Sequence, residues 1–404
     1  MKEQDTKHRL DQKKPHILTL IVMSSFASMG AIIFTPALPE IQQYFNISQG
    51  HSQLTITLFL VGYALGQLVY GVLSNYFGRR NTFFIGVIIA TIGSIASILS
   101  EPLHSFNLLI LGRMLEAFGS SAGLVLSFTI INDYYFPDQA RRIISYVVLA
   151  FAIIPGVATF IGGILVTHFH WISCFYFLLF YGLLIAIPIY YLEETATILD
   201  KHTLNISSIK SAYVKVFKNS IIRNTSLFFA MHGMCVYAYA ATAPFIAIHT
   251  LNISPEKFGT IGLIPYVGTA LGAIAAPYLS KKLSMKLLIK SSVICEIIFC
   301  GMLITLLYLN YVTLPVLVIC GFLFMFSGCI IAINGSAMAS SASEDKAIAS
   351  SVMNFINIGM GMMGTFMLAF LPGGAELRLS IVFVIALTLM VLFWSKLKMP
   401  EEKP

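Results

Sequence analysis

Charged side chains are scarce in this 404-residue chain. They make up 11% of the residues, whereas 57% are hydrophobic and the mean hydropathy is +0.83. Because a soluble domain carries roughly 25% charged residues, this composition excludes an ordinary soluble protein and indicates a membrane protein. Polar stretches are equally scarce, and residues 193–223 form the only long polar connection.

Metal-binding and catalytic patterns are also missing from the sequence. The six cysteines have no metal-ligand spacing, so we expect free, packed thiols and neither a metal nor a cofactor. A membrane-embedded enzyme would show a dense catalytic constellation and a receptor would carry a signalling domain, and the sequence shows neither. The cysteines all fall within apolar runs: Cys174, Cys235, Cys295, Cys300, Cys320 and Cys329.

Twelve apolar runs approach the roughly 20 residues that a helix needs to cross a bilayer. They are long and do not alternate apolar with polar residues, so they predict helices rather than strands. We therefore predict an all-α membrane protein with twelve transmembrane helices in two pseudo-symmetric six-helix bundles. The predicted divisions are a cytoplasmic tail at 1–15, bundles at 16–192 and 224–396, a cytoplasmic linker at 193–223 and a second cytoplasmic tail at 397–404.

The basic residues are distributed unevenly between the loops. With the N-terminus in the cytoplasm, 22 of the 25 Lys and Arg residues fall on the cytoplasmic side, while the other side receives Lys257 and Arg378. The positive-inside rule therefore predicts that both termini are cytoplasmic. The net charge of +7 is interpreted as a topology signal rather than as a nucleic-acid-binding surface.

A 206-residue repeat relates the two halves of the chain. Residues 46–48 read NIS and recur at 252–254, and the VGYALG of residues 61–66 recurs as VGTALG at 267–272. We expect Ser48 and Ser254 to be helix N-caps rather than parts of glycosylation sites. Repeat-built transporters place a substrate site between two such halves and use it for alternating access, so the repeat indicates a transporter.

Two glycine-containing motifs are candidates for conformational control. Residues 71–80 read GVLSNYFGRR: Gly71 permits close helix approach, Gly78 suits a left-handed turn, and Arg79 and Arg80 hold the cytoplasmic face. Residues 155–163 read PGVATFIGG, where a proline within a span is expected to kink the helix and paired glycines allow a tight crossing. The candidate gating residues are Gly71, Asn75, Gly78, Arg79, Arg80, Pro155, Gly162 and Gly163.

These motifs resemble those of the major facilitator superfamily and its drug:proton antiporters. PALP at 36–39, LEET at 192–195, YAATAPF at 239–245 and LNISPEKFG at 251–259 resemble the Bcr/CflA drug-resistance branch, and the resemblance runs from about residue 16 to 395. It implies a bacterial inner-membrane transporter that exports drug-like molecules. The chain departs from the family at two positions. Asn75 replaces the usual acidic residue that is thought to hold helices together in one conformation. Ile32 occupies a position where members of this branch often carry an acidic residue that takes part in proton transport.

Three charged residues lie well inside predicted spans, where ionisable groups are costly and usually functional. Arg113 and Glu116 are three residues apart, so they share a helix face and can pair. Arg113 also matches the fourth-helix arginine of the superfamily motif. We interpret Glu116 as the proton carrier, with Arg113 favouring its ionised form while they are paired; the alternative is a permanent structural pair. Glu296, in a peripheral span, is expected to have a structural role.

The remaining site candidates are polar residues predicted to line a central cavity. His232 could titrate near neutral pH, although a packed, hydrogen-bonded histidine is the alternative, as interhelical hydrogen bonding is for the others. With Arg113, the candidate cavity residues are Tyr63, His232, Tyr239, Asn334, Asn354 and Asn357. At the repeat offset from Arg113 and Glu116 stand Ile319 and Phe322, so the chemistry is expected in the N-terminal half alone.

The sequence thus predicts a monomeric secondary transporter that exports a small organic molecule in exchange for protons. The alternative is a carrier of an anionic metabolite or siderophore, running inward, in which Arg113 binds the substrate. The expected partners are the substrate, protons and the lipid bilayer, and no nucleic acid.

Overall fold

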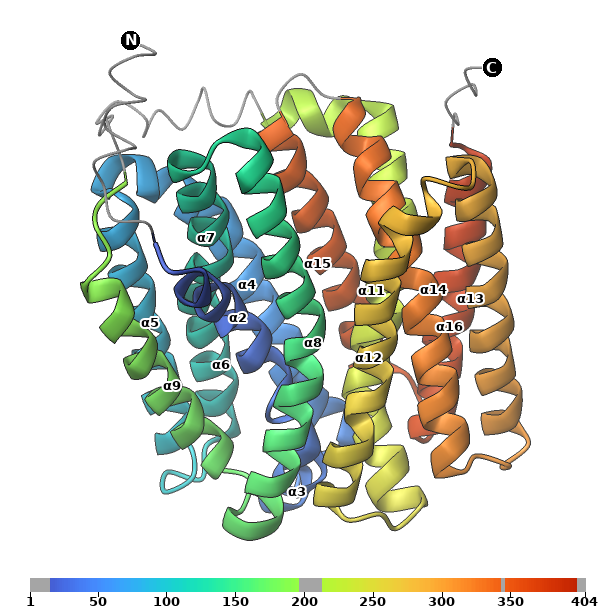
Figure 1. Cartoon of the computed structure of the whole chain (residues 1–404). Coiled ribbons are helices and arrows are strands. Elements are labelled where there is room, and N and C mark those ends of the chain that lie inside the picture. The colour runs from blue at the N-terminus through green and yellow to red at the C-terminus, as the bar shows by residue number, and fades with distance from the viewer. Residues whose placement is uncertain (1–14, 196–212, 343–345, 398–404) are drawn as a thin grey trace, which may run out of the picture.

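The computed structural model describes residues 15–195, 213–342 and 346–397, and within them the chain is helical throughout, without a strand (Figure 1). Twelve of its helical segments are long and apolar enough to cross a membrane. The predicted fold class and number of spans are therefore confirmed. Of the predicted polar segments, residues 1–14, 196–212 and 398–404 lie outside the described part of the chain.

The N-terminal half contains six spans, of which the first and fourth are each built from more than one helix. Its elements are α2 (Ile17–Ile32), η1 (Thr35–Ala37), α3 (Leu38–Tyr44), α4 (Gln49–Phe77), α5 (Arg79–Leu99), α6 (Phe106–Ser120), α7 (Ala122–Tyr134), α8 (Pro137–Phe169) and α9 (Ser173–Tyr190). The C-terminal half consists of α11 (Ser220–Phe245), η2 (Ile246–Thr250), α12 (Pro255–Leu279), α13 (Met285–Tyr308), α14 (Leu314–Ser341), α15 (Lys346–Phe370) and α16 (Ala375–Ser395).

The repeated NIS triplets are helix boundaries in both halves. Asn46 and Asn252 have positive φ angles of 50° and 53°, a conformation that asparagine tolerates better than most residues. Two residues later, Ser48 accepts a hydrogen bond from the backbone N–H of His51, and Ser254 accepts one from that of Lys257. The predicted N-caps of α4 and α12 are confirmed.

The repeated glycines mark equivalent helix crossings. A Cβ on Gly62 of α4 would strike the carbonyl of Met114 in α6, and a Cβ on Gly268 of α12 would strike that of Phe322 in α14. The glycines are 206 residues apart, but Met114 and Phe322 are 208 apart. The structural counterparts of Arg113 and Glu116 are therefore Gly321 and Phe324 rather than the residues at the plain repeat offset.

The two halves contact each other through α4 with α15 and α8 with α12. Hydrogen bonds between the halves gather near α3: the Thr57 hydroxyl donates to that of Thr365 over 2.9 Å, and the Gln53 amide donates to the Ala241 carbonyl over 3.1 Å. Figure 1 shows α8 and α12 approaching each other at this end and diverging toward the opposite end, where α11 begins and α16 ends. The halves are thus joined more tightly at one end than at the other.

Candidate functional site

The first candidate site is the ion pair within α6. The Arg113 Nη1 donates to the Glu116 Oε2 over 2.8 Å, and the two side chains are 0% and 1% exposed. The pairing that their spacing predicts is therefore present. A buried ion pair is costly to desolvate, so the surroundings of the guanidinium decide whether this one is stable.

The Arg113 guanidinium is surrounded by groups that stabilise a cation. Its Nη2 donates to the carbonyl oxygen of Gly30 over 2.6 Å. Its central carbon lies 4.1 Å from the ring centroid of Phe34 and 4.3 Å from that of Phe59, so the cation is held between two aromatic faces. Four spans converge here, because Phe175 of α9 contributes a third ring at 5.7 Å.

Arg113 keeps one buried atom, its Nε, without a hydrogen-bond partner among the described residues. Glu116 is similar. Its Oε2 is used by Arg113, but its Oε1 is buried without a hydrogen-bond partner among the described residues. This oxygen faces Gly30 of α2, where an added Cβ would lie only 2.9 Å away. Gly30 precedes by two residues Ile32, the position at which the resemblance led us to expect an acid. The Glu116 carboxylate, which belongs to the fourth span, therefore contacts the first span.

A second buried pair, which was not predicted, joins α11 to α13 in the C-terminal half. His232 Nδ1 lies 2.9 Å from the Oε1 of Glu296, and both residues are buried. The imidazole packs edge-on against Phe324 and fills the space left by Gly328, where a Cβ would strike the ring. His232 is therefore packed within its own half, as in the alternative interpretation, and Glu296 makes the helix contact expected of it. The sequence could not show this pair because its members are 64 residues apart.

Two further cavity candidates instead hold helices together. The Tyr239 hydroxyl donates to the carbonyl of Leu317 over 3.0 Å, which ties α11 to α14. Asn334 of α14 accepts a hydrogen bond from the Ser280 hydroxyl at the end of α12 over 3.1 Å. In this structure both side chains make the interhelical contacts of the alternative interpretation.

The remaining cavity candidates are Tyr63, Asn354 and Asn357, and the side chain of Asn357 faces Gly233 of α11 in its own half. The buried Tyr63 of α4 has a hydroxyl without a hydrogen-bond partner among the described residues. Asn354 and Asn357 are half-buried on α15.

Tyr237 of α11 packs against Gly361 of α15, and Tyr266 of α12 packs against Gly156 of α8 across the boundary between the halves. Sequence reasoning missed Tyr237 and Tyr266, because a tyrosine in a span has no distinguishing pattern.

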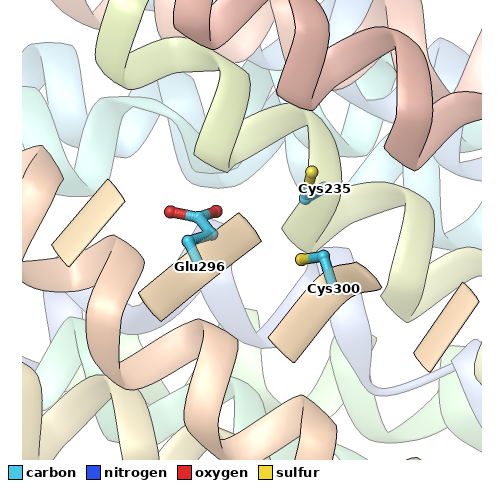
Figure 2. Close-up of side chains that lie close together, drawn as sticks. All are labelled: Cys235, Glu296 and Cys300. Atoms are coloured by element: carbon cyan, nitrogen blue, oxygen red, sulfur yellow. The ribbon is translucent and has the colours of Figure 1, made fainter. Parts of the chain in front are cut away.

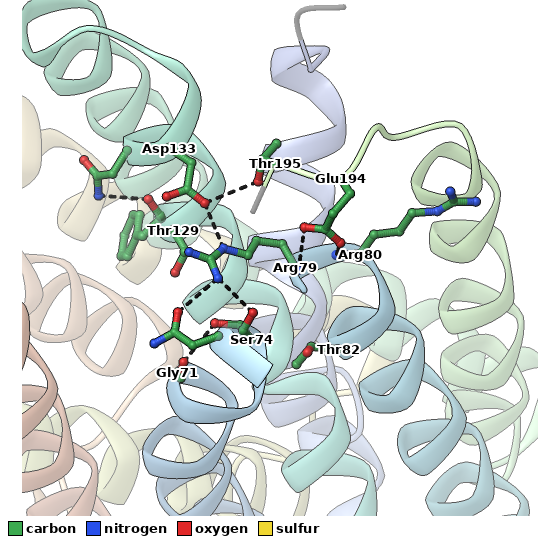
Figure 3. Close-up of polar contacts among 12 residues, drawn as sticks. Gly71, Ser74, Arg79, Arg80, Thr82, Thr129, Asp133, Glu194 and Thr195 are labelled. Carbon is green, nitrogen blue, oxygen red and sulfur yellow. Dashed lines mark hydrogen bonds and ion pairs between the residues drawn. The ribbon is translucent and has the colours of Figure 1, made fainter. Parts of the chain in front are cut away.

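The loop between α4 and α5 holds Arg79 in a network of polar contacts (Figure 3). Its Nε donates to Asp133 Oδ2 at the end of α7 over 2.8 Å, and its Nη1 donates to the Asn75 side chain over 3.0 Å. Asn75 therefore contributes a neutral hydrogen bond, as its type implies. Asp133, which the sequence analysis did not single out, supplies the carboxylate.

Glu194, just beyond the end of α9, caps the N-terminus of α5. Its two carboxylate oxygens accept the backbone N–H groups of Arg79, over 2.8 Å, and Arg80, over 3.1 Å (Figure 3). An anion is favoured here by the unpaired N–H groups and the helix dipole. Gly78 has φ +85° and ψ 167° and faces this carboxylate, so it takes a positive-φ conformation that favours glycine, but not the left-handed helical one.

The glycines of the second motif make the tight crossings that were predicted. In α8, Gly162 packs against the carbonyl of Ile33, and Gly163 packs against Gly259 of α12. The helix continues through Pro155. Gly71 differs from the prediction: a Cβ there would meet nothing within 4 Å, so this glycine does not serve a close helix approach in this structure.

Two bundles of membrane-spanning helices, with buried charges inside and tight crossings between them, define a membrane transporter. The sequence matches the model of the Major Facilitator Superfamily over residues 20–366, and the chain belongs to this family. Members of this family are transporters and not enzymes.

Relatives place the chain close to the drug-resistance branch. It is 29% identical over 252 residues to a bicyclomycin resistance protein homolog of Haemophilus influenzae, with 62% of this chain and 58% of that protein covered. It is 26% identical over 281 residues to multidrug resistance protein D of Escherichia coli, with 69% of each chain covered. This chain spans 58% to 64% of the length of three of the curated relatives that it matches.

Solved structures share the fold at low sequence identity. The xylose transporter XylE of E. coli, in a partially occluded inward open conformation, superimposes with a TM-score of 0.71 at 12% identity, covering 96% of this chain and 98% of that one. A bacterial homolog of the human lysosomal transporter Spinster gives a TM-score of 0.70 at 14% identity, with 95% and 98% covered.

Proposed function

We propose that this chain exports a small organic molecule across a bacterial inner membrane in exchange for protons. Residues 16–192 would rock against residues 224–396, exposing a site between the halves to each side in turn. The observation that carries the proposal is the buried Arg113–Glu116 pair, whose carboxylate contacts the first span at Gly30. The export direction is supported by the similarity to relatives named for drug resistance.

We assign this conformation to the inward-facing state of the proposed cycle. The uneven distribution of Lys and Arg supports a cytoplasmic location for both termini, which puts α3 at the outer side. The contacts of Gln53 and Thr57 across the halves lie near α3, so the outer side is closed. Opening that side requires these hydrogen bonds and the Gly163–Gly259 crossing to separate.

Glu116 is proposed to carry the proton because it is an ionisable group that movement of a neighbouring helix can expose. In the inward-facing state it is sealed by Gly30 and paired with Arg113. A shift of α2 would remove both the cover and the Gly30 carbonyl that holds the guanidinium. Glu116 would then exchange its proton with water on one side before the pair closes again.

The residues at the boundary favour a neutral or weakly cationic aromatic substrate over an anion. Tyr266 of α12 packs against Gly156 of α8 across this boundary, and the hydroxyl of the buried Tyr63 of α4 has no hydrogen-bond partner among the described residues, so both would offer an aromatic ring and a hydroxyl group to a substrate. The alternative, an anionic metabolite held by Arg113, is less well supported. This guanidinium is fully buried, and Glu116, a carbonyl and aromatic rings already surround it.

The test is substrate-driven proton flux in proteoliposomes, with a substrate first identified by a resistance screen in a host lacking its own efflux pumps. Glu116→Gln keeps the side-chain shape but cannot release a proton, so flux should fall to the level of empty liposomes while substrate binding persists. Glu101→Gln, in the loop before α6, is the matched control and should retain coupling. Intact coupling in Glu116→Gln would overturn the proposed proton role.

A further inference from the structure

A cluster of metal-ligating side chains lies within the C-terminal half. The two thiol sulfurs of Cys235 and Cys300 and a carboxylate oxygen of Glu296 all lie within 4.8 Å of one another, and all three residues are buried. Figure 2 shows Glu296 and Cys300 on successive turns of α13, with Cys235 of α11 beside them. Both thiols are free.

Residue spacing along α11 and α13 places the side chains of this cluster on the facing surfaces of the two helices. Cys235 follows His232 by three residues on α11, and Cys300 follows Glu296 by four residues on α13. Such spacings put side chains on one face of a helix, so each helix presents two groups to the other. The sequence alone shows no metal motif, because the two pairs are 64 residues apart and meet only through the packing of α11 on α13.

Only one of the two carboxylate oxygens of Glu296 has a hydrogen-bond partner in the described part of the chain. His232 Nδ1 lies 2.9 Å from one oxygen of Glu296, while the other oxygen is buried without a hydrogen-bond partner among the described residues. A hydrogen bond from a neighbouring side chain to a ligating group is typical of metal sites. A buried, unpartnered oxygen is costly in an apolar core, and a bound cation would satisfy it.

We propose that Cys235, Glu296 and Cys300 bind a thiophilic d¹⁰ cation such as Zn²⁺, which ties α11 to α13. Tetrahedral zinc with bonds of about 2.3 Å to sulfur places its ligands roughly 3.5–4 Å apart, so the present cluster needs to contract by only about 1 Å. Binding releases the two thiol protons to solvent, and the two thiolates and the carboxylate then place three negative charges around the two positive charges of Zn²⁺.

The test is the metal content of the purified, tag-free protein after equilibration with Zn²⁺ and desalting. The wild type should retain about one Zn²⁺ per chain, and Cys235→Ser with Cys300→Ser should reduce this by about tenfold or more. Cys329→Ser, a buried thiol of α14 outside the cluster, is the matched control and should retain the metal. Size-exclusion chromatography establishes that each variant is folded.

Co²⁺ provides a second readout that needs no variant. Bound at the cluster, it should give the intense sulfur-to-metal charge-transfer absorption of thiolate ligands. Absence of this band together with substoichiometric Zn²⁺ in the wild type overturns the site. So does a folded Cys235→Ser/Cys300→Ser protein that binds as much Zn²⁺ as Cys329→Ser. Neither measurement depends on transport, so the result is independent of the proposed export function.

Discussion

At the scale of single residues, the partner of each buried acid determines its chemical environment. Glu116 and Glu296 are both buried acids in membrane-spanning helices, but their partners differ. Glu116 pairs with a permanently charged arginine in the same helix, whereas Glu296 pairs with a histidine in another helix. The first arrangement could be predicted from a three-residue spacing, and the second could not.

Gly328 makes the second pair sterically possible, and this gives a prediction at the residue scale. In Gly328→Ala the new methyl group would strike the His232 ring, so we expect the free energy of unfolding to fall by about 1–3 kcal/mol. The measurement is thermal unfolding in detergent.

Gly301→Ala is the control, because a Cβ at Gly301 of α13 would meet nothing within 4 Å. Removing a helical glycine there should be neutral or stabilising by up to about 1 kcal/mol. Equal midpoints for the two alanine variants would contradict the steric argument.

At the scale of elements, the chain stabilises helix ends with groups that are distant in sequence. The start of α5 is the clearest example, since its backbone N–H groups bind the Glu194 carboxylate that follows α9. This contact closes the N-terminal half on itself at the side opposite α3. Arg79 continues the network to Asp133 of α7.

Glu194→Ala should therefore weaken the N-terminal half. Loss of the anion at the N-terminus of α5 should lower the free energy of unfolding by about 1 kcal/mol, and up to about 2 kcal/mol in a partly buried setting. Glu193→Ala removes the same charge one residue earlier and leaves these backbone hydrogen bonds intact. Similar losses in unfolding midpoint for both variants would contradict the capping argument.

At the scale of the whole molecule, the two halves meet along α4 with α15 and α8 with α12. Glycines let α8 and α12 approach closely near α3, while threonines join α4 to α15 by a hydrogen bond. Such contacts are polar or small in area, so they can break and re-form. The proposed alternating access requires this property of the boundary between the halves.

Thr57→Cys with Thr365→Cys should lock the halves when the new thiols are oxidised. The hydroxyl oxygens of the native residues are 2.9 Å apart, so a disulfide can form with little movement. Under the proposed export function, oxidation should abolish substrate-driven flux in the double variant, and reduction should restore it.

The single variants control for the native cysteines and should be unaffected by the oxidant. A double variant that is fully cross-linked but transports at the wild-type rate would contradict the rocking of the two halves.

Much of the architecture could be predicted because it depends on local physical chemistry. Apolar runs of sufficient length must form helices in a bilayer, and serines before helices satisfy their first N–H groups. The positive φ of Gly78 and the pairing of Arg113 with Glu116 are equally local. The expectation for Gly71 was wrong, because a glycine has the same appearance in the sequence whether or not another helix lies against it.

The sequence by itself determined the twelve spans, the repeat, the helix caps and the buried pair of α6. Only the tertiary structure decided that His232 pairs with Glu296, that Asp133 balances Arg79, and that Cys235 and Cys300 face the same carboxylate. The physical reason is the distance along the chain. Helical periodicity fixes neighbours three or four residues apart, whereas partners on different helices depend on how whole helices pack.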